Sequence, residues 1–173
     1  CNVLETASVQ AAHDLIVKDF GTCDILINGA GGNNPKATTD DEYFVPEDLN
    51  EMKTFFDLDP DGVSFVFSLN FMGTLIPTQV FAKDMVNKKG ASIINISSMN
   101  AYTPLTKIPA YSGAKAAISN FTQWLAVHFS KVGIRCNAIA PGFFSTQQNA
   151  KLLFNEDGTP TARTGKILAG TPM

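Results

Sequence analysis

Three short, largely apolar runs separated by long stretches of helical spacing constrain the fold of this chain more than any other feature. The runs are residues 24–27, 91–96 and 134–140. Apolar runs of this length, each ending at a turn, are typical of strands buried in a parallel sheet. Strands that alternate with long helices require right-handed crossovers. We therefore predict an α/β fold whose parallel sheet is covered by helices on both faces.

The spacing of apolar residues also predicts where the helices lie. The expected helices are residues 7–20, 62–88, 110–131, 145–154 and 161–169. Glycines at 21, 90 and 133 are expected to end the first three. Pro77 removes a hydrogen bond to the carbonyl of Gly73, so we expect a bend there. Residues 33–61 are interpreted as a long loop with one short helix near residues 47–55, and residues 1–5 as the end of a strand.

Length, charge and cysteine content narrow the function classes. A chain of 173 residues that is 45% hydrophobic can form one core, which predicts a single domain over residues 1–173. A net charge of −3 provides no basic surface for nucleic acid or for membrane headgroups. The three cysteines, Cys1, Cys23 and Cys136, have no spacing suited to zinc or disulfides, which favours a reducing, cytoplasmic location. We find no apolar run of ~18 residues and no signal peptide, so we expect a soluble protein.

The carboxyl ends of the predicted strands are the first place to look for a site, because open parallel sheets bind ligands there. The residues at these ends are 28–32, 97–98 and 141–142. Glycines at 29, 31 and 32 would let the backbone approach a ligand closely, but a strand also needs glycine simply to turn. This feature alone does not separate the two interpretations.

A tyrosine and a lysine in the predicted helix 110–131 indicate acid–base chemistry. Tyr111 and Lys115 are four residues apart and share a helix face, an arrangement also common on exposed faces. An ammonium ~4 to 5 Å from a phenol, at an effective dielectric of ~20, is worth roughly 3 to 4 kcal/mol, which would lower the phenol pKa by about two to three units. Ser98 at a strand end could then hold a reacting oxygen. Asn70, inside a nearly apolar helix, needs a partner to offset its desolvation.

These residues resemble the motifs of the short-chain dehydrogenase/reductase family over nearly the whole chain. The matching motifs are Asn28-Gly29-Ala30-Gly31, Asn70-Phe71-Met72-Gly73, Ser98 with Tyr111 and Lys115, and Pro141-Gly142 with Thr146. The resemblance implies a Rossmann-like, doubly wound sheet. It also implies that Tyr111 is the general acid/base, that Ser98 orients the substrate, and that Lys115 tunes Tyr111 and binds the nicotinamide ribose of NAD or NADP. Asn70 would hold a water of the proton relay.

The resemblance also implies a set of cofactor contacts. Besides Tyr111 and Lys115, the cofactor-binding residues would be Asn2, Val3, Asn28, Ala30, Gly31, Pro141, Gly142 and Thr146. Thr146 would meet the carboxamide of the cofactor. Asn2 and Val3 would lie near the adenine, where the family usually has Asp rather than Asn. No metal ligand set is implied.

Within the family, the stretch from Ser98 to Tyr111 and the tail after Phe143 are most similar to the sugar-acid branch, and especially to mannonate oxidoreductases (fructuronate reductases). The implied reaction interconverts D-mannonate and D-fructuronate. Polar candidates for contacting such a substrate are Asn100, Thr103, Thr106, Lys107 and Asn149. Alternatives are a gluconate 5-dehydrogenase, a 3-oxoacyl carrier protein reductase, or a non-catalytic scaffold with the same fold. The family also implies a homodimer or homotetramer that uses helices 62–88 and 110–131.

The chain departs from the family at its ends. The family begins with a strand and a Thr-Gly-x-x-x-Gly-x-Gly turn, which receives the pyrophosphate at a helix N-terminus and is absent here. We expect that strand and the next to precede Cys1, and the last strand and helix of the family to follow Met173. The residues that choose NAD or NADP would then lie outside this sequence. We accordingly expect the isolated polypeptide to bind cofactor poorly and to be inactive.

Overall fold

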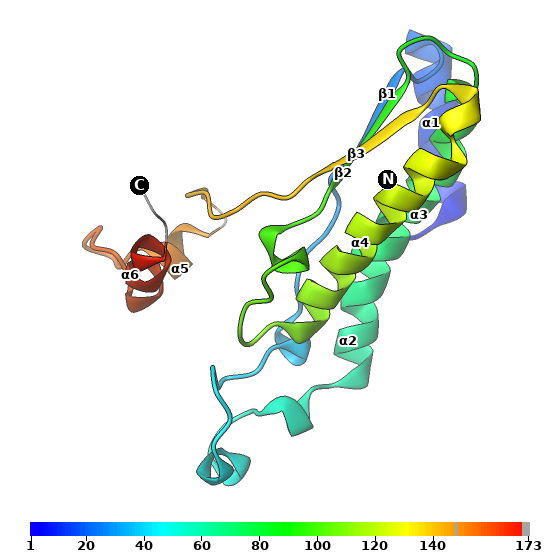
Figure 1. Cartoon of the computed structure of the whole chain (residues 1–173). Coiled ribbons are helices and arrows are strands. Elements are labelled where there is room, and N and C mark those ends of the chain that lie inside the picture. The colour runs from blue at the N-terminus through cyan, green and yellow to red at the C-terminus, as the bar shows by residue number, and fades with distance from the viewer. Residues whose placement is uncertain (148, 171–173) are drawn as a thin grey trace. The chain divides into compact units, whose positions relative to one another are not determined.

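The computed structural model of the chain describes residues 1–147 and 149–170, and it contains two compact units, Cys1–Ala140 and Pro141–Met173. The first unit is built on a parallel sheet of three strands in the order β1 (Ile25–Asn28), β2 (Ser92–Ile96) and β3 (Arg135–Ile139) (Figure 1). In the register, Leu26 pairs with Ile93, and Ile93 pairs with Cys136. The predicted α/β class is confirmed.

Four helices accompany this sheet. They are α1 (Thr6–Phe20), α2 (Pro60–Phe67), α3 (Gly73–Met85) and α4 (Pro109–His128). A π-helical turn, Ser68–Met72, joins α2 and α3 into one continuous helix from Pro60 to Met85. Helix α3 connects β1 to β2 and α4 connects β2 to β3, as expected for crossovers in a parallel sheet.

Buried hydrogen bonds show that α3 and α4 cover the same face of the sheet. Asn28 of β1 donates from Nδ2 to Thr78 Oγ1 of α3 at 2.9 Å. Asn95 of β2 donates from Nδ2 to Thr122 Oγ1 of α4 at 2.9 Å, and it accepts from Asn28 at 2.8 Å. The two asparagines are register partners and therefore point to one side. Two right-handed crossovers that step in the same direction place both helices on that side.

In the part of the chain described here, the side chains on the opposite face of the sheet are largely exposed. Three isoleucines on this face are more than half exposed: Ile25 at 59%, Ile27 at 63% and Ile139 at 52%. The sequence predicts strands buried on both faces, because an apolar side chain gives the same sequence signal whether or not another layer of secondary structure covers it.

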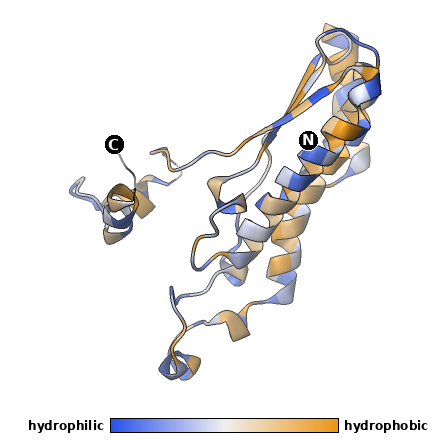
Figure 2. Ribbon diagram, in the orientation of Figure 1, coloured by the Kyte–Doolittle hydropathy of each residue, from blue (hydrophilic) through white to orange (hydrophobic). Residues whose placement is uncertain are grey.

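The main hydrophobic core lies between the sheet and the two crossover helices. Its buried members are Ala82, Met85, Ala91, Ile93, Leu125, Ile134 and Cys136. Much of α2 and α3 is hydrophobic (Figure 2). By length and composition, the helix Pro60–Met85 could cross a membrane, contrary to our expectation from sequence. Half of its most apolar window is buried within the structure, as in a core helix.

Several local predictions differ from the structure. Residues 1–5 form a turn and not a strand. The segment between β1 and α2 has three short 3₁₀ turns in place of one helix, Pro35–Ala37, Pro46–Asn50 and Phe55–Asp57, because prolines and short polar side chains cap each turn separately. The helical geometry continues through Pro77. Gly90 and Gly133 have positive φ, as a stop signal requires, but lie a few residues beyond the helices.

The second unit is small and helical. It contains α5 (Ala150–Leu153) and α6 (Ala162–Ala169), and an antiparallel bridge joins Phe154 to Pro160. Helix α6 matches its predicted range, whereas α5 is much shorter than residues 145–154. Thr161 caps α6 by accepting a hydrogen bond from the Thr164 amide.

A histidine between α1 and α3 makes the stability of the first unit depend on pH. His13 Nε2 lies 2.9 Å from Asp84 Oδ2 and Nδ1 lies 3.0 Å from Asp14 Oδ1, and the ring packs edge-on against Phe81. The hydrogen bond to Asp14 raises the pKa of His13 above its usual 6.5, burial opposes this, and Asp84 raises it further.

We therefore expect His13→Gln to destabilise the protein by roughly 0.5 to 1 kcal/mol below pH 6, and by progressively less as pH rises through the raised pKa of His13. The charged form is the one that the carboxylates stabilise, so the contribution is complete only below the unfolded pKa. Thermal unfolding of both proteins from pH 5.5 to 9 measures the difference. Asp84→Asn should reproduce the trend, and a difference that does not vary with pH would contradict it.

Candidate active site

The carboxyl end of β2 and the first turns of α4 bring three of the predicted site residues together. Ser98 is the second residue after β2, and its Oγ accepts a hydrogen bond from the Asn100 amide at 3.2 Å. Tyr111 and Lys115 lie one turn apart on α4. The side chains of Ser98 and Tyr111 are hydrogen-bonded, and Lys115 Nζ lies over the Tyr111 ring, 5.5 Å from its centroid.

Lys115 is a buried cation held by a backbone carbonyl. It is only 4% exposed, and its Nζ donates to the carbonyl of Ile96, the last residue of β2, at 2.8 Å. The main chain of Lys115 is fixed as well, because Ser97 Oγ donates to the Lys115 carbonyl at 3.1 Å. Ser97 Oγ also shares a hydrogen bond with Ser119 Oγ. Lys115 is therefore attached to the end of β2 through both its side chain and its main chain.

Asn70 joins the long helix to the turn after β1. It sits in the π-helical turn, is fully buried, and donates from Nδ2 to the carbonyls of Val66 at 2.8 Å and Gly32 at 2.7 Å. Its Oδ1 accepts from the Gly32 amide at 3.3 Å. These hydrogen bonds satisfy the buried side-chain amide of Asn70, which needed a partner. A π-helical turn is a common way to place such a side chain at a functional site.

Gly31 is the point at which the turn, Asn70 and Lys115 meet. A Cβ atom added there would lie 2.6 Å from Asn70 Oδ1 and 3.2 Å from Lys115 Nζ. The first distance is shorter than any ordinary contact, so only glycine fits without displacement. The structure thus brings Asn70 and Lys115 together at one backbone turn, and Lys115 in turn lies over the Tyr111 ring.

Burial controls the protonation of the two titratable groups. It raises the pKa of Tyr111 above 10, and the hydrogen bond from Ser98 only partly opposes this. It lowers the pKa of Lys115 to about 8. The expectation that Lys115 lowers the pKa of Tyr111 is not met in this structure, since the amine is directed to the Ile96 carbonyl and lies against the ring face. The phenol is therefore held in its protonated form, which can donate a proton.

Three of the residues predicted to contact the cofactor, Asn2, Val3 and Ala30, lie near this turn. The side chain of a fourth, Asn28, points away from it. Val3 lies near Ala30, because both contact the position that a Cβ of Gly73 would occupy, at 3.1 Å and 4.0 Å. Asn2 caps the same N-terminal turn by accepting from the Leu4 amide and donating to Glu5. The Asn28 amide points into the core, where it bonds Thr78 and Asn95, so only its main chain is available at the turn.

The remaining predicted contacts, Pro141, Gly142 and Thr146, belong to the second unit. Within that unit, the Thr146 amide and hydroxyl both donate to Asn149 Oδ1, at 2.8 and 3.1 Å. Asn149 in turn donates to the Phe144 carbonyl at 2.7 Å. Their role toward a cofactor stays a prediction.

The sequence reasoning missed the polar layer beneath the site. Asn95, Ser97 and Thr122 are buried and link β2 to α4 through side-chain hydrogen bonds. A signal was available, because two polar residues stand in or directly after a strand of isoleucines. Buried polar residues need hydrogen-bond partners inside the protein, and the flanking helices are the elements that can supply them.

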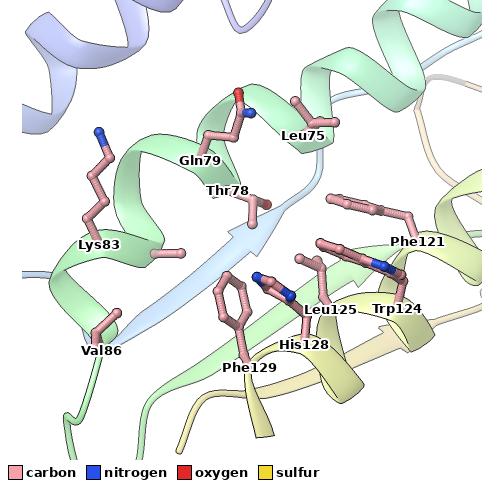
Figure 3. Close-up of a pocket in the computed structure, with 11 residues that line it drawn as sticks. Leu75, Thr78, Gln79, Lys83, Val86, Phe121, Trp124, Leu125, His128 and Phe129 are labelled. Atoms are coloured by element: carbon pink, nitrogen blue, oxygen red, sulfur yellow. The ribbon is translucent and has the colours of Figure 1, made fainter. Parts of the chain in front are cut away.

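A well-defined cavity in the structure lies away from this site. It measures about 510 Å³ and lies between α3 and α4, where Leu75, Gln79, Val86, Phe121, Trp124 and His128 are among the residues that line it (Figure 3). None of the predicted catalytic residues lines it. Among residues 1–147 and 149–170, no group of three or more His, Cys, Asp or Glu could hold a metal ion.

Comparison with known proteins identifies clear relatives. The profile of the short chain dehydrogenase family matches residues 1–157. An uncharacterized oxidoreductase of Haemophilus influenzae is 71% identical over 173 residues, covering 99% of this chain and 60% of that protein. The chain thus spans about 60% of the length of this curated relative.

Solved structures of two oxidoreductases are also similar to this chain. A protein from Haemophilus influenza, provisionally assigned as a D-mannonate oxidoreductase and determined with bound NAD, superposes with a TM-score of 0.94 at 70% identity, covering 99% of this chain and 61% of that one. A gluconate 5-dehydrogenase from Burkholderia cenocepacia, in complex with NADP and tartrate, superposes with a TM-score of 0.70 at 27% identity, covering 91% and 55%.

We expect Gly31→Ala to destabilise the protein by about 1 to 3 kcal/mol, because the added methyl group must displace Asn70 or Lys115 from buried hydrogen bonds. Urea unfolding measures the change. Gly29→Ala is the matched control, since its nearest neighbour, Ile96 Cγ1, lies 4.0 Å from the added atom. Equal effects of the two substitutions would show that the contact at Gly31 carries no special weight.

Proposed function

The chain belongs to the short chain dehydrogenase family, and we propose that the protein containing it is an oxidoreductase that transfers a hydride between NAD or NADP and a sugar acid. The single observation that carries this proposal is a connected set of side chains: Asn70 and Lys115 meet at the turn of Gly31, and Lys115 lies over the ring of Tyr111, which neighbours Ser98. A scaffold without catalysis would need neither a phenol hydrogen-bonded to a serine nor a buried ammonium beside it.

The residues present fit a nicotinamide cofactor. At Gly31 the backbone is bare where a Cβ would fill the space beside Asn70 and Lys115, which leaves the turn accessible to a ligand at close range. Ala30, Gly31, Tyr111 and Lys115 would hold the nicotinamide end, with Asn2, Val3, the main chain of Asn28, Pro141, Gly142 and Thr146 as the further proposed contacts. When bound, the cofactor supplies or accepts the hydride, which no side chain can store.

The chain's own residues handle the proton. In the reducing direction, Tyr111 donates its hydroxyl proton to the substrate oxygen, and its raised pKa keeps that proton available. Ser98, already hydrogen-bonded to Tyr111, holds the same substrate oxygen in place. Lys115, with a pKa of about 8, is mostly charged at neutral pH, and its proposed role is to bind the nicotinamide ribose when the cofactor is present. Asn70 fixes the Gly32 backbone next to them and would hold a water of the proton relay.

The sugar-acid substrate rests on similarity. The relative with the provisional D-mannonate assignment shares 70% of its aligned residues with this chain, and a gluconate 5-dehydrogenase shares the fold. We propose D-mannonate and D-fructuronate as the substrate pair. The cysteines Cys1, Cys23 and Cys136 are all unpaired, in keeping with a cytoplasmic location.

Replacement of Tyr111 tests the chemistry. In the full-length protein, we expect Tyr111→Phe to lower kcat for D-fructuronate reduction by about 10³-fold, because the proton donor is lost while the ring remains. The dissociation constant for NADH, measured by fluorescence, should change little. Equal loss of turnover and cofactor binding would favour a scaffold role, and turnover of 3-oxoacyl thioesters or 5-ketogluconate without turnover of fructuronate would overturn the substrate assignment.

We also propose that the full-length protein is a homodimer or homotetramer that associates through the α3–α4 surface. The groove there is apolar, and its rim exposes Trp124 at 55%, Val127 at 76% and Val86 at 45%. Trp124 stacks on His128 with 4.4 Å between ring centroids, which presents a flat aromatic surface (Figure 3). Exposed aromatic residues beside an apolar groove are typical of protein interfaces.

For this assembly we expect Trp124→Glu to shift the full-length protein to a smaller species in light scattering, because a carboxylate cannot be buried unpaired at an apolar interface. Tyr102→Glu, at a residue 67% exposed outside the groove, is the matched control and should leave the mass unchanged. An unchanged mass for Trp124→Glu would exclude this surface as the interface.

A further inference from the structure

Residues 33–59 form an arm between the turn after β1 and α2, and the root of this arm lies beside the candidate site. Ala37 in the root is fully buried in a cluster with Val66, Ala110 and Ala114. The Tyr111 side chain packs against the same cluster. The arm root and the Tyr111 side chain therefore pack against the same apolar cluster.

Two hydrogen bonds fix the root to the loop that precedes α4, and two more join Asp40 to Lys53 within the arm. The Thr39 amide donates to the Lys107 carbonyl at 2.9 Å, and Lys107 Nζ donates to the Asp40 carbonyl at 2.8 Å. The Asp40 amide donates to the Lys53 carbonyl at 2.7 Å, and the Lys53 amide donates to Asp40 Oδ2 at 3.1 Å. We call the first two bonds the Lys107 clasp, because one residue holds the arm root through both its main chain and its side chain.

The backbone of Lys107 is in an uncommon conformation. Its φ is +71°, in the left-handed region that residues with a Cβ seldom adopt, and among the residues described here only Asn87 shares this feature outside glycine. This conformation is unfavourable for a lysine, because its Cβ crowds the backbone there. The two bonds to the arm offset that cost, so the loop before α4 and the arm root stabilise each other. Lys107 stands four residues before Tyr111 and next to the start of α4.

We propose that Lys107 is a positioning residue that holds the arm root as a wall of the substrate site, and so determines how tightly a sugar acid is bound. The proposal rests on the function proposed above. It assigns Lys107 a role different from the one its charge suggests, namely pairing with the substrate carboxylate, since its ammonium is directed to the Asp40 carbonyl.

The geometry separates this role from catalysis. The recorded partners of Lys107 are the backbones of Thr39 and Asp40, and they include none of Asn70, Ser98, Tyr111 and Lys115. Loss of the clasp would move the wall formed by residues 37–41 and leave the proton donor and the glycine turn with their own hydrogen bonds. Substrate affinity should therefore change while the chemical step and cofactor binding do not.

The test uses Lys107→Asn in the full-length protein. Asparagine tolerates the left-handed conformation but is too short to reach the Asp40 carbonyl, so the variant removes the ammonium bond without adding backbone strain. We expect the KM for D-fructuronate to rise about tenfold, with kcat and the NADH dissociation constant within about twofold of wild type. Lys107→Arg, which keeps a cation of similar reach, should restore most of the affinity. Lys89→Met, at an exposed lysine, is the matched control.

A second measurement does not depend on any substrate. Amide hydrogen exchange at Thr39 should accelerate in Lys107→Asn and not in Lys89→Met, because its partner carbonyl belongs to Lys107. Unchanged exchange together with an unchanged KM would overturn the proposal, as would a parallel rise in the NADH dissociation constant. If wild type turns over no sugar acid, the proposed function fails, and the exchange result still decides whether the clasp exists.

Discussion

The site depends on the absence of a side chain at Gly31. The backbone after β1 can approach the long helix and α4 only because no Cβ stands between it, Asn70 Oδ1 and Lys115 Nζ. Asn70 then completes the contact by bonding the Gly32 backbone on both its donor and acceptor sides. A strand end, a π-helical turn and the second turn of α4 are thus joined at one point, and the position of Tyr111 follows from that of α4, whereas Ser98 is placed by the end of β2. The π-helical turn is part of the same contact, because the Asn70 amide within it bonds the carbonyls of both Val66 and Gly32.

Much of this arrangement could be predicted from sequence, and the exceptions have a common physical basis. The strands, α1, α4 and the parallel order follow from periodicity and from glycine stop signals, both of which are local. The four central site residues were identified from spacing because strand ends and helix faces fix them locally as well. Properties that depend on distant segments were not predictable. Examples are the exposed side chains of Ile25 and Ile27, the core-facing amide of Asn28, and the protonation of Tyr111, which burial dominates over its charged neighbour.

The site also contains a charged group whose burial is energetically unfavourable. Lys115 is a cation at 4% exposure with a carbonyl partner and no carboxylate in its recorded bonds, and its pKa falls to about 8 as a result. A structural lysine would gain from reaching solvent or an acid, whereas this one is held between the Tyr111 ring and the end of β2. Local cost of this kind, surrounded by well-satisfied polar groups such as Asn95 and Thr122, is typical of functional sites.

In the function proposed above, chemistry and selectivity belong to different parts of the chain that share one contact. The proton donor and its neighbours are fixed by regular elements, β2 and α4, whose hydrogen bonds are mostly buried. The arm from 33 to 59 has only short 3₁₀ turns and depends on a few bonds at its root, of which two involve Lys107. Both parts meet at the cluster of Ala37, Val66, Ala110 and Ala114, against which Tyr111 packs. Because the arm contributes little to the sheet or the main core, its sequence can change with limited cost to the fold, whereas changes at Gly31 or Asn70 would alter the catalytic geometry directly.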